Sequence, residues 1–162
     1  MVRPLAEWFG RVEASDIFDY GAGFPQCDYL FGPDPDPVDW TITNPPFRLA
    51  EQFIERARRT SRGGVAMIVR SAFLEGSGRY SRLFALRPPH LVLQFTERVL
   101  MLKGRLVADG AVCPKLGRKV TSATAYSWLV WDMTNVKRET RLDWIGPSRK
   151  RLERAGDYEA AA

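Results

Sequence analysis

The stretch "DWTITNPPFRLAEQF", residues 39–53, decides the fold of this chain. Its first part is an apolar strand, and its second part begins a helix whose Leu49, Phe53 and Ile54 lie on one face. Two prolines separate these elements. A strand that passes through a tight turn into an amphipathic helix is the repeating unit of α/β proteins.

The rest of the chain extends this pattern with further apolar and amphipathic segments. We expect the end of a helix at 3–10 with a stop at Gly10, and at most a short strand within 27–31. Strands are predicted at 11–18, 38–44, 63–73, 90–100 and 124–133, and helices at 47–60 and 79–86. The last two strands form an antiparallel, hairpin-like pair near the C-terminus, so the predicted fold class is α/β.

Composition indicates an ordinary globular domain. The chain has 162 residues, of which 45% are hydrophobic and 27% are charged, and it has no apolar run of membrane-spanning length. Cys27 and Cys113 lie far apart, and residues 1–30 lack a signal-peptide core, which favours a cytoplasmic, reducing location. The net charge of +5 favours a polyanionic partner. We expect one domain at 1–147 and a charged, fraying tail at 148–162.

The double proline lies where chemistry is expected. In open α/β sheets, ligands bind at the carboxyl ends of the strands, and Asn44 to Phe47 lie at such an end. Because proline fixes its backbone angle, this turn can direct the Asn44 side-chain oxygen and the Pro45 carbonyl at one amine donor. Phe47 adds a flat face. The set suits a planar ring that carries an exocyclic NH2, whereas the alternative is a rigid turn with Phe47 in the core.

The "TNPPF" sequence at 43–47 resembles the Asn-Pro-Pro-aromatic motif of S-adenosylmethionine-dependent amino-methyltransferases, above all the adenine-specific DNA methyltransferases. With "ASDI", "CDYL" and "TAYSWLVW", the pattern is similar to small phage and prophage methyltransferases over roughly residues 1–147. The resemblance implies a Rossmann-like class I methyltransferase sheet, S-adenosyl-L-methionine as cofactor and DNA as partner. A metal is not expected, because His90 has no ligand partners.

The resemblance also implies roles for individual residues. Asn44, Pro45, Pro46 and Phe47 would be catalytic. Asp16 would contact the cofactor's ribose, Ile17 would pack on its adenine ring, Asp28 would accept from its adenine amine, and Asn44 would complete the cofactor site. Each of the first three has an alternative: Asp16 capping a turn, Ile17 in the core, and Asp28 solvated.

The glycine loop of the cofactor site is not evident. Such a loop comes about 20 residues before the ribose-binding acid, and this distance from Asp16 runs past Met1. "FDYGAGF" at 18–24 resembles the loop, but about twenty residues separate it from Asn44, where one βαβ unit takes about 30 or more. We therefore interpret Gly21 to Gly23 as a turn. We expect a truncated chain that lacks the first strand and glycine loop.

A basic loop separates the last two predicted strands, and it faces the target in the family that the chain resembles. Phosphate contacts are predicted for Arg98, Lys103, Arg105, Lys115, Arg118 and Lys119. The alternative is a solvated loop whose charges serve solubility. Tyr126 offers either a second surface for a flipped base or a packing residue of its strand.

Three functions stay open at this level. The first is methylation of adenine in DNA, with any sequence preference supplied by the loop at 99–124. The second is methylation of another amide or amine, such as a protein glutamine, because those enzymes share the motif. The third is a truncated, catalytically impaired remnant that still binds nucleic acid.

Overall fold

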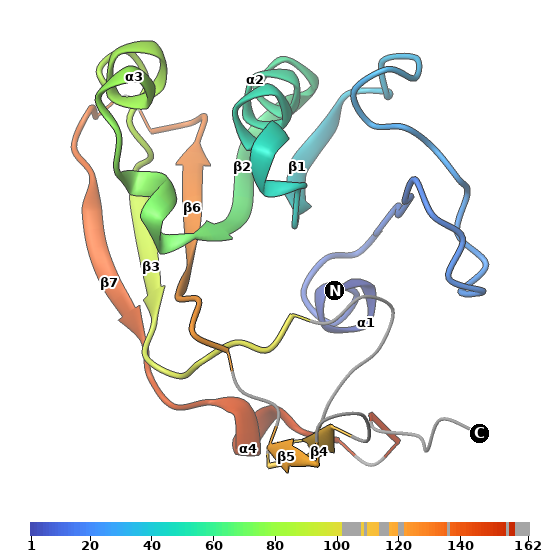
Figure 1. Cartoon of the computed structure of the whole chain (residues 1–162). Helices are drawn as coiled ribbons and strands as arrows, with labels where there is room; N and C mark the ends of the chain where they lie inside the picture. The colour runs from blue at the N-terminus through green and yellow to red at the C-terminus, as the bar shows by residue number, and fades with distance from the viewer. Residues whose placement is uncertain are drawn as a thin grey trace.

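A computed structural model of the chain describes residues 1–101, 108, 110–113, 117–119, 122–135, 137–154 and 156–157. Its centre is a five-stranded sheet (Figure 1). The strands follow the spatial order β1 (Val38–Thr43), β2 (Ser61–Arg70), β6 (Tyr126–Asp132), β3 (Leu91–Phe95) and β7 (Arg141–Ile145). The chain is thus a mixed α/β protein, an architecture compatible with a Rossmann-like fold.

The directions of the strands place the carboxyl ends of four of them at the same edge of the sheet. β1 and β2 are parallel, β3 and β7 are parallel, and β6 runs antiparallel to both β2 and β3. The carboxyl ends of β1, β2, β3 and β7 therefore point the same way, as Figure 1 shows. The predicted antiparallel pairing of the last two apolar strands is confirmed by β3 and β6.

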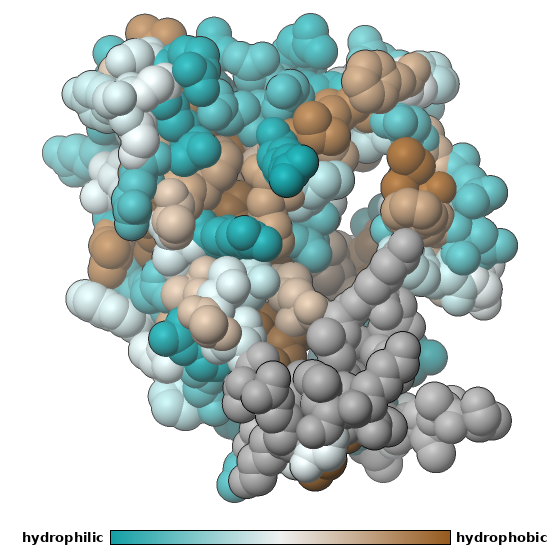
Figure 2. All heavy atoms as spheres, viewed as in Figure 1, coloured by the Kyte–Doolittle hydropathy of each residue, from teal (hydrophilic) through white to brown (hydrophobic). Residues whose placement is uncertain are grey.

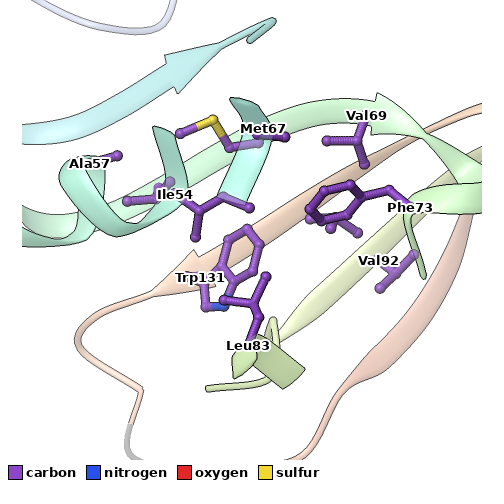
Figure 3. Close-up of a cluster of buried hydrophobic side chains, with 11 residues drawn as sticks. Ile54, Ala57, Met67, Val69, Phe73, Leu83, Val92 and Trp131 are labelled. Carbon is purple, nitrogen blue, oxygen red and sulfur yellow. The ribbon is translucent and has the colours of Figure 1, made fainter. Parts of the chain in front are cut away.

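Helices cover one face of the sheet and form the core there. They are α2 (Ala50–Thr60), α3 (Ser77–Arg79) with the π-helical turn Tyr80–Phe84 that continues it, and the 3-10 turn Ser71–Leu74. Figure 3 shows Ile54, Met67, Leu83 and Trp131 packed together between these helices and the strands. The fully buried β2 run confirms the predicted apolar strand.

The other face of the sheet is less covered. Along β6, Leu129 and Trp131 are buried, while Trp128 and Val130, which alternate with them, are half-buried. Such alternation marks a sheet with one face in the core and one nearer to solvent. The smaller elements are α1 (Val2–Leu5), α4 (Arg149–Leu152), the 3-10 turn Phe47–Leu49, and a two-stranded ribbon of β4 (Val112–Cys113) and β5 (Arg118–Lys119).

The strand predicted at 11–18 is wrong. This segment contributes one isolated bridge, between Asp16 and Gln26. Side-chain oxygens explain the loss, because Asp16 accepts a hydrogen bond from the Phe18 amide at 3.0 Å and Asp19 accepts one from the Gly21 amide at 2.7 Å. The first of these turns occupies the Phe18 amide, which a strand ladder would need, and the second turns the chain directly after the segment.

Two further differences concern the ends of the chain. The first helix is shorter than predicted, although helical backbone bonds continue to the Phe9 amide, directly before Gly10. β7 was not predicted, and it adds an edge strand beside β3. Within the expected tail, residues Arg149–Leu152 form the helical turn α4.

The N-terminal segment exposes several aromatic side chains. Trp8 is 86% exposed and Phe31 is 85% exposed, with Phe18, Tyr20 and Phe24 between them also exposed. Figure 2 shows apolar groups on the right of the view, where this segment runs outside the sheet. The part of the segment at 8–24 is therefore only loosely packed on the core.

Candidate functional site

The NPPF turn, defined as Asn44 to Phe47, follows β1 directly. Thr43 pairs with Met67 as the last register pair of β1 and β2, so the turn leaves the sheet at its carboxyl edge. Pro45 is buried and Pro46 is exposed. The Pro46 carbonyl accepts a hydrogen bond from the Leu49 amide at 2.8 Å, which begins the helical turn at once. The turn is thereby fixed at both ends.

Two acceptors of this turn have no hydrogen-bond donor within the described part of the chain. They are the Asn44 side-chain oxygen Oδ1 and the Pro45 carbonyl oxygen. The Asn44 amide nitrogen Nδ2 instead donates to the Met101 sulfur at 3.6 Å, and the Asn44 side chain is exposed. Because Nδ2 faces Met101, the oxygen Oδ1 of the same amide group is left to accept a hydrogen bond from a ligand.

Phe47 is half-buried between two neighbours. Its ring centroid lies 5.7 Å from that of Tyr126, with planes inclined by 40°. The guanidinium carbon of Arg70 lies 4.9 Å from the Phe47 ring centroid. Tyr126 is only 6% exposed, so of its two predicted roles the packing role is the one the structure supports.

A polar cluster behind the turn, which the sequence did not reveal, connects three strand ends. The Gln94 oxygen Oε1 lies 2.9 Å from the Ser71 hydroxyl and 2.8 Å from the Ser127 hydroxyl, and the two hydroxyls are 2.8 Å apart. The Gln94 amide nitrogen donates to the Phe95 and Tyr126 carbonyls, both at 3.0 Å. Because Ser127 is fully buried, this satisfied network holds Tyr126 and the end of β2 in place.

Of the predicted cofactor residues, Asp16, Ile17 and Asp28 lie in one segment, for which the structure gives no contact with Asn44 in the NPPF turn. The Asp16–Gln26 bridge places Asp16 and Ile17 beside the segment that carries Asp28. One oxygen of Asp28 accepts hydrogen bonds from the Leu30 and Phe31 amides at 2.9 and 3.0 Å. Oδ1 of Asp16 serves its own turn in the same way, and the Ile17 side chain is 53% exposed, so it is not in the core.

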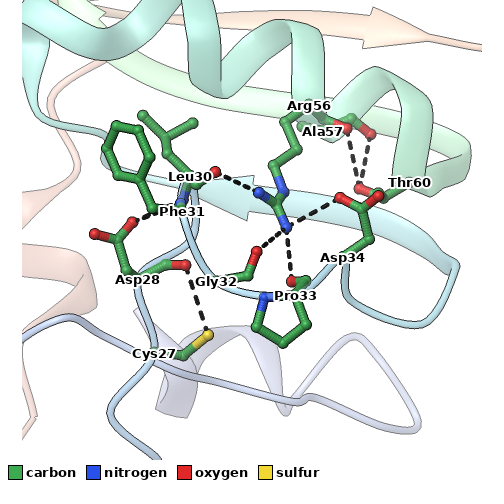
Figure 4. A network of polar contacts seen from close by, with 10 residues as sticks. All are labelled: Cys27, Asp28, Leu30, Phe31, Gly32, Pro33, Asp34, Arg56, Ala57 and Thr60. Atoms are coloured by element: carbon green, nitrogen blue, oxygen red, sulfur yellow. Dashed lines mark hydrogen bonds and ion pairs between the residues drawn. The ribbon is translucent and has the colours of Figure 1, made fainter.

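Arg56 fastens the second half of this segment to α2 (Figure 4). Its buried guanidinium donates to the carbonyls of Leu30, Gly32 and Pro33 at 2.5, 2.9 and 2.6 Å, and it pairs with Asp34 at 3.0 Å. The sequence marked Arg56 only as a helix residue. Its partners lie more than twenty residues earlier, and no local pattern signals them.

The predicted phosphate-binding residues are only partly placed. Arg98 is exposed and donates to the Ala123 carbonyl at 3.2 Å. Arg118 and Lys119 form β5 through their backbone. Lys103, Arg105 and Lys115 lie outside the described residues.

A separate cavity of about 460 Å³ lies beside α2, and the NPPF turn is not part of it. Its lining includes Leu30, Phe31, Gln52, Arg59 and Arg87. We give this hollow less weight than the turn, because its lining consists largely of charged and polar side chains of the protein surface, whereas the turn presents two acceptors, unpaired among the described residues, beside an aromatic ring.

Comparison with family models, curated proteins and solved structures gives no match. Within the residues that the structure describes, no helix has the length and apolar character that crossing a membrane requires. Among the described His, Cys, Asp and Glu side chains, no group of three or more could hold a metal ion.

Proposed function

We propose that this chain transfers a methyl group from S-adenosyl-L-methionine to the exocyclic amine of adenine in DNA, within a Rossmann-like methyltransferase fold. One observation carries the proposal. Asn44 Oδ1 and the Pro45 carbonyl are two acceptors without partners in the described part of the chain, on a rigid turn beside the Phe47 ring. An aromatic amine has two hydrogens to donate and a flat ring to stack.

The two acceptors explain how the amine becomes a nucleophile. The lone pair of an aromatic NH2 is delocalised into its ring. Hydrogen bonds to Asn44 Oδ1 and to the Pro45 carbonyl favour a pyramidal nitrogen, which localises the lone pair on that atom. As the nitrogen bonded the methyl carbon, the methyl–sulfur bond of the cofactor would break and its sulfur would leave as a neutral thioether. The nitrogen would then carry the positive charge and release its proton to water, so no strong base would be needed before attack.

The proposed target must leave the duplex before it reaches the turn. Base flipping costs a few kcal/mol, and stacking on an aromatic side chain recovers about 1–3 kcal/mol. Phe47 is half-buried and supported by Tyr126, so its ring is held in one orientation. Its position next to the two acceptors lets stacking and amine recognition act on the same base.

The chemistry of Asp16, Ile17 and Asp28 fits the cofactor. Their turns use one oxygen of each carboxylate, so within the described residues the second oxygen of Asp16 and of Asp28 is available to hydroxyl or amine donors. Ile17 adds an exposed apolar side chain beside them. These residues and Asn44 would hold the nucleoside part of S-adenosylmethionine, whose sulfonium supplies an electrophilic methyl group when it is bound.

A radiolabel assay tests the proposal. The protein is incubated with tritiated S-adenosylmethionine and either DNA or a protein lysate, and Asn44→Ala is compared with Asn135→Ala, an exposed asparagine in the turn after β6. We expect label in DNA adenine that is lost in Asn44→Ala and kept in Asn135→Ala. Unchanged labelling by Asn44→Ala would contradict the mechanism.

The same assay separates the other two functions. Label in protein alone would support a glutamine or other amide methyltransferase, because a side-chain amide also presents two hydrogens to the same acceptors. DNA binding without any label would support the impaired remnant.

A further inference from the structure

Arg70 lies at the same sheet edge as the NPPF turn, and no role was predicted for it from the sequence. It is the last residue of β2, whose parallel neighbour β1 leads directly into Asn44. Its exposed side chain turns back over the Phe47 ring, with the guanidinium carbon 4.9 Å from the ring centroid. Arg70 therefore occupies the surroundings of the aromatic group that the proposed substrate would use.

The charge of Arg70 is not neutralised within the described part of the chain. Other arginines there form ion pairs, such as Arg56 with Asp34 and Arg82 with Glu51. No described carboxylate lies within ion-pair distance of Arg70, and the one described contact of its guanidinium is the Phe47 ring. An exposed cation–π contact is weak, so a ligand readily replaces it.

The backbone around Arg70 is rigid, which fixes where the guanidinium can reach. Arg70 pairs with Tyr126 across β2 and β6, and the next residue, Ser71, belongs to the buried Gln94 cluster. The side chain can move on this anchor while its Cα stays beside the NPPF turn. A planar fork of N–H donors in such a place matches a phosphate, which it binds through two parallel hydrogen bonds.

We infer that Arg70 exchanges its contact with Phe47 for a phosphate of a polynucleotide substrate, and so selects a nucleotide over a protein amide at the NPPF turn. The inference rests on the proposed function for the amine that enters the turn. A base that stacks on Phe47 competes with the guanidinium for the ring, and the same nucleotide brings a phosphate that receives it. A glutamine side chain brings no such anion.

Binding measurements test the inference without requiring methyl transfer. Fluorescence anisotropy of a labelled single-stranded oligonucleotide is followed as a function of NaCl concentration for the wild type, Arg70→Gln, Arg70→Lys and Arg62→Gln. Arg62 is the matched control, because it is exposed on the same strand but at the opposite end. Removing one phosphate contact lowers the log–log salt slope by about 0.7 on a single strand.

We expect Arg70→Gln to lose that slope increment and to bind about tenfold more weakly at low salt. Arg70→Lys keeps the charge and the slope, and Arg62→Gln behaves as the wild type. An unchanged slope in Arg70→Gln, or a wild type that binds no oligonucleotide, overturns the inference. Thermal unfolding of each variant verifies the fold, and if Arg70→Gln does not fold, the same comparison is made with Arg70→Met.

Methyl transfer distinguishes failure of the inference from failure of the proposed function. If Arg70→Gln lowers the salt slope but the wild type labels no adenine, the proposed function fails while the phosphate contact stands. If labelling depends on Asn44, and Arg70→Gln leaves both the salt slope and the KM for the oligonucleotide unchanged, the phosphate contact of Arg70 is wrong while the proposed function stands. With both correct, Arg70→Gln raises KM about tenfold and changes kcat little.

Discussion

The rings of Phe47 and Tyr126 lie 5.7 Å apart at an angle of 40°, so the residue after the double proline rests on a strand that enters the sheet some eighty residues later. This contact links the proposed target site to the core, because Tyr126 is buried in β6 while Phe47 is half-buried. The two rings should therefore respond differently to substitution.

Phe47→Leu should lower methyl transfer to DNA by about 10- to 100-fold, because it removes the stacking surface for the base. Phe47→Tyr keeps a ring and should stay close to the wild type. A double-mutant cycle on urea unfolding with Tyr126→Leu should give a coupling of about 0.5–1.5 kcal/mol between the rings. Wild-type transfer by Phe47→Leu would contradict the role of the ring.

Arg56→Met should lower the free energy of unfolding by about 1–3 kcal/mol, because three carbonyls lose a charged donor at once. Amide hydrogen exchange at residues 30–34 should rise in the same variant, since the Arg56 guanidinium holds this segment on α2. Arg59→Met, on an exposed position of the same helix, is the control. Unchanged exchange at 30–34 would show that other contacts hold the segment.

Arg58→Met should leave the free energy of unfolding unchanged or raise it by up to about 1 kcal/mol. In the described part of the chain, Nε and Nη1 of Arg58 are buried without a hydrogen-bond partner. Burial, and secondarily the charge of Arg87, lowers the pKa of Arg58, so the charged form is disfavoured there. Urea unfolding measures the difference, and a clear loss of stability would reveal a contact that the guanidinium makes.

Glu97 should make the stability of the region before α4 depend on pH. Hydrogen bonds from the Arg149 and Ser148 amides, at 3.0 and 2.7 Å, lower the pKa of Glu97 below its ordinary 4.5. A carboxyl with a lowered folded-state pKa contributes stability above its unfolded pKa and loses it as the pH falls through the folded value. The stabilisation is therefore fully present above pH 4.5 and is lost progressively as the pH falls below 4.5 and through the lower folded-state pKa.

The amide proton shifts of Ser148 and Arg149 should report this titration by NMR, with a midpoint below 4.5. The shift changes should vanish in Glu97→Gln and persist in Glu139→Gln, which alters an exposed glutamate elsewhere. A midpoint above 4.5 would show that these hydrogen bonds do not form in solution.

The sequence predicted those elements whose periodicity is strong and local. The strand before Asn44, the helix whose Ile54 is buried, and the apolar β2 all lie where their patterns indicated. It could not predict that β6 inserts between β2 and β3, because strand order depends on pairings between distant segments. The strand at 11–18 was wrongly predicted because Asp16 forms a turn with the Phe18 amide, which the alternation of residue types does not reveal.

In the candidate site, too, the local features could be predicted and the tertiary contacts could not. The NPPF turn could be predicted because proline imposes its geometry on its own neighbours. The contact of Arg70 with Phe47 and the Gln94 cluster arise from tertiary packing, which brings together residues from different strands. No spacing rule in the sequence identifies them.

Gly64→Ala should destabilise the sheet by about 1–3 kcal/mol, because overpacking a close-packed core forces side chains and backbone to move. A Cβ at Gly64 would lie 2.4 Å from ring atoms of Trp40 and 2.8 Å from the Trp131 carbonyl oxygen. Gly146→Ala is the matched control, because a Cβ at that position meets no atom within 4 Å. Urea unfolding followed by tryptophan fluorescence measures both variants.

Trp40→Leu distinguishes the two possible sources of this strain. Gly64 pairs with Trp40 across β1 and β2, and the indole ring lies over the glycine. If the ring is the obstacle, Gly64→Ala should cost less stability in the Trp40→Leu background than in the wild type. An equal cost in both backgrounds would assign the strain to the Trp131 carbonyl, which no substitution of Trp40 removes.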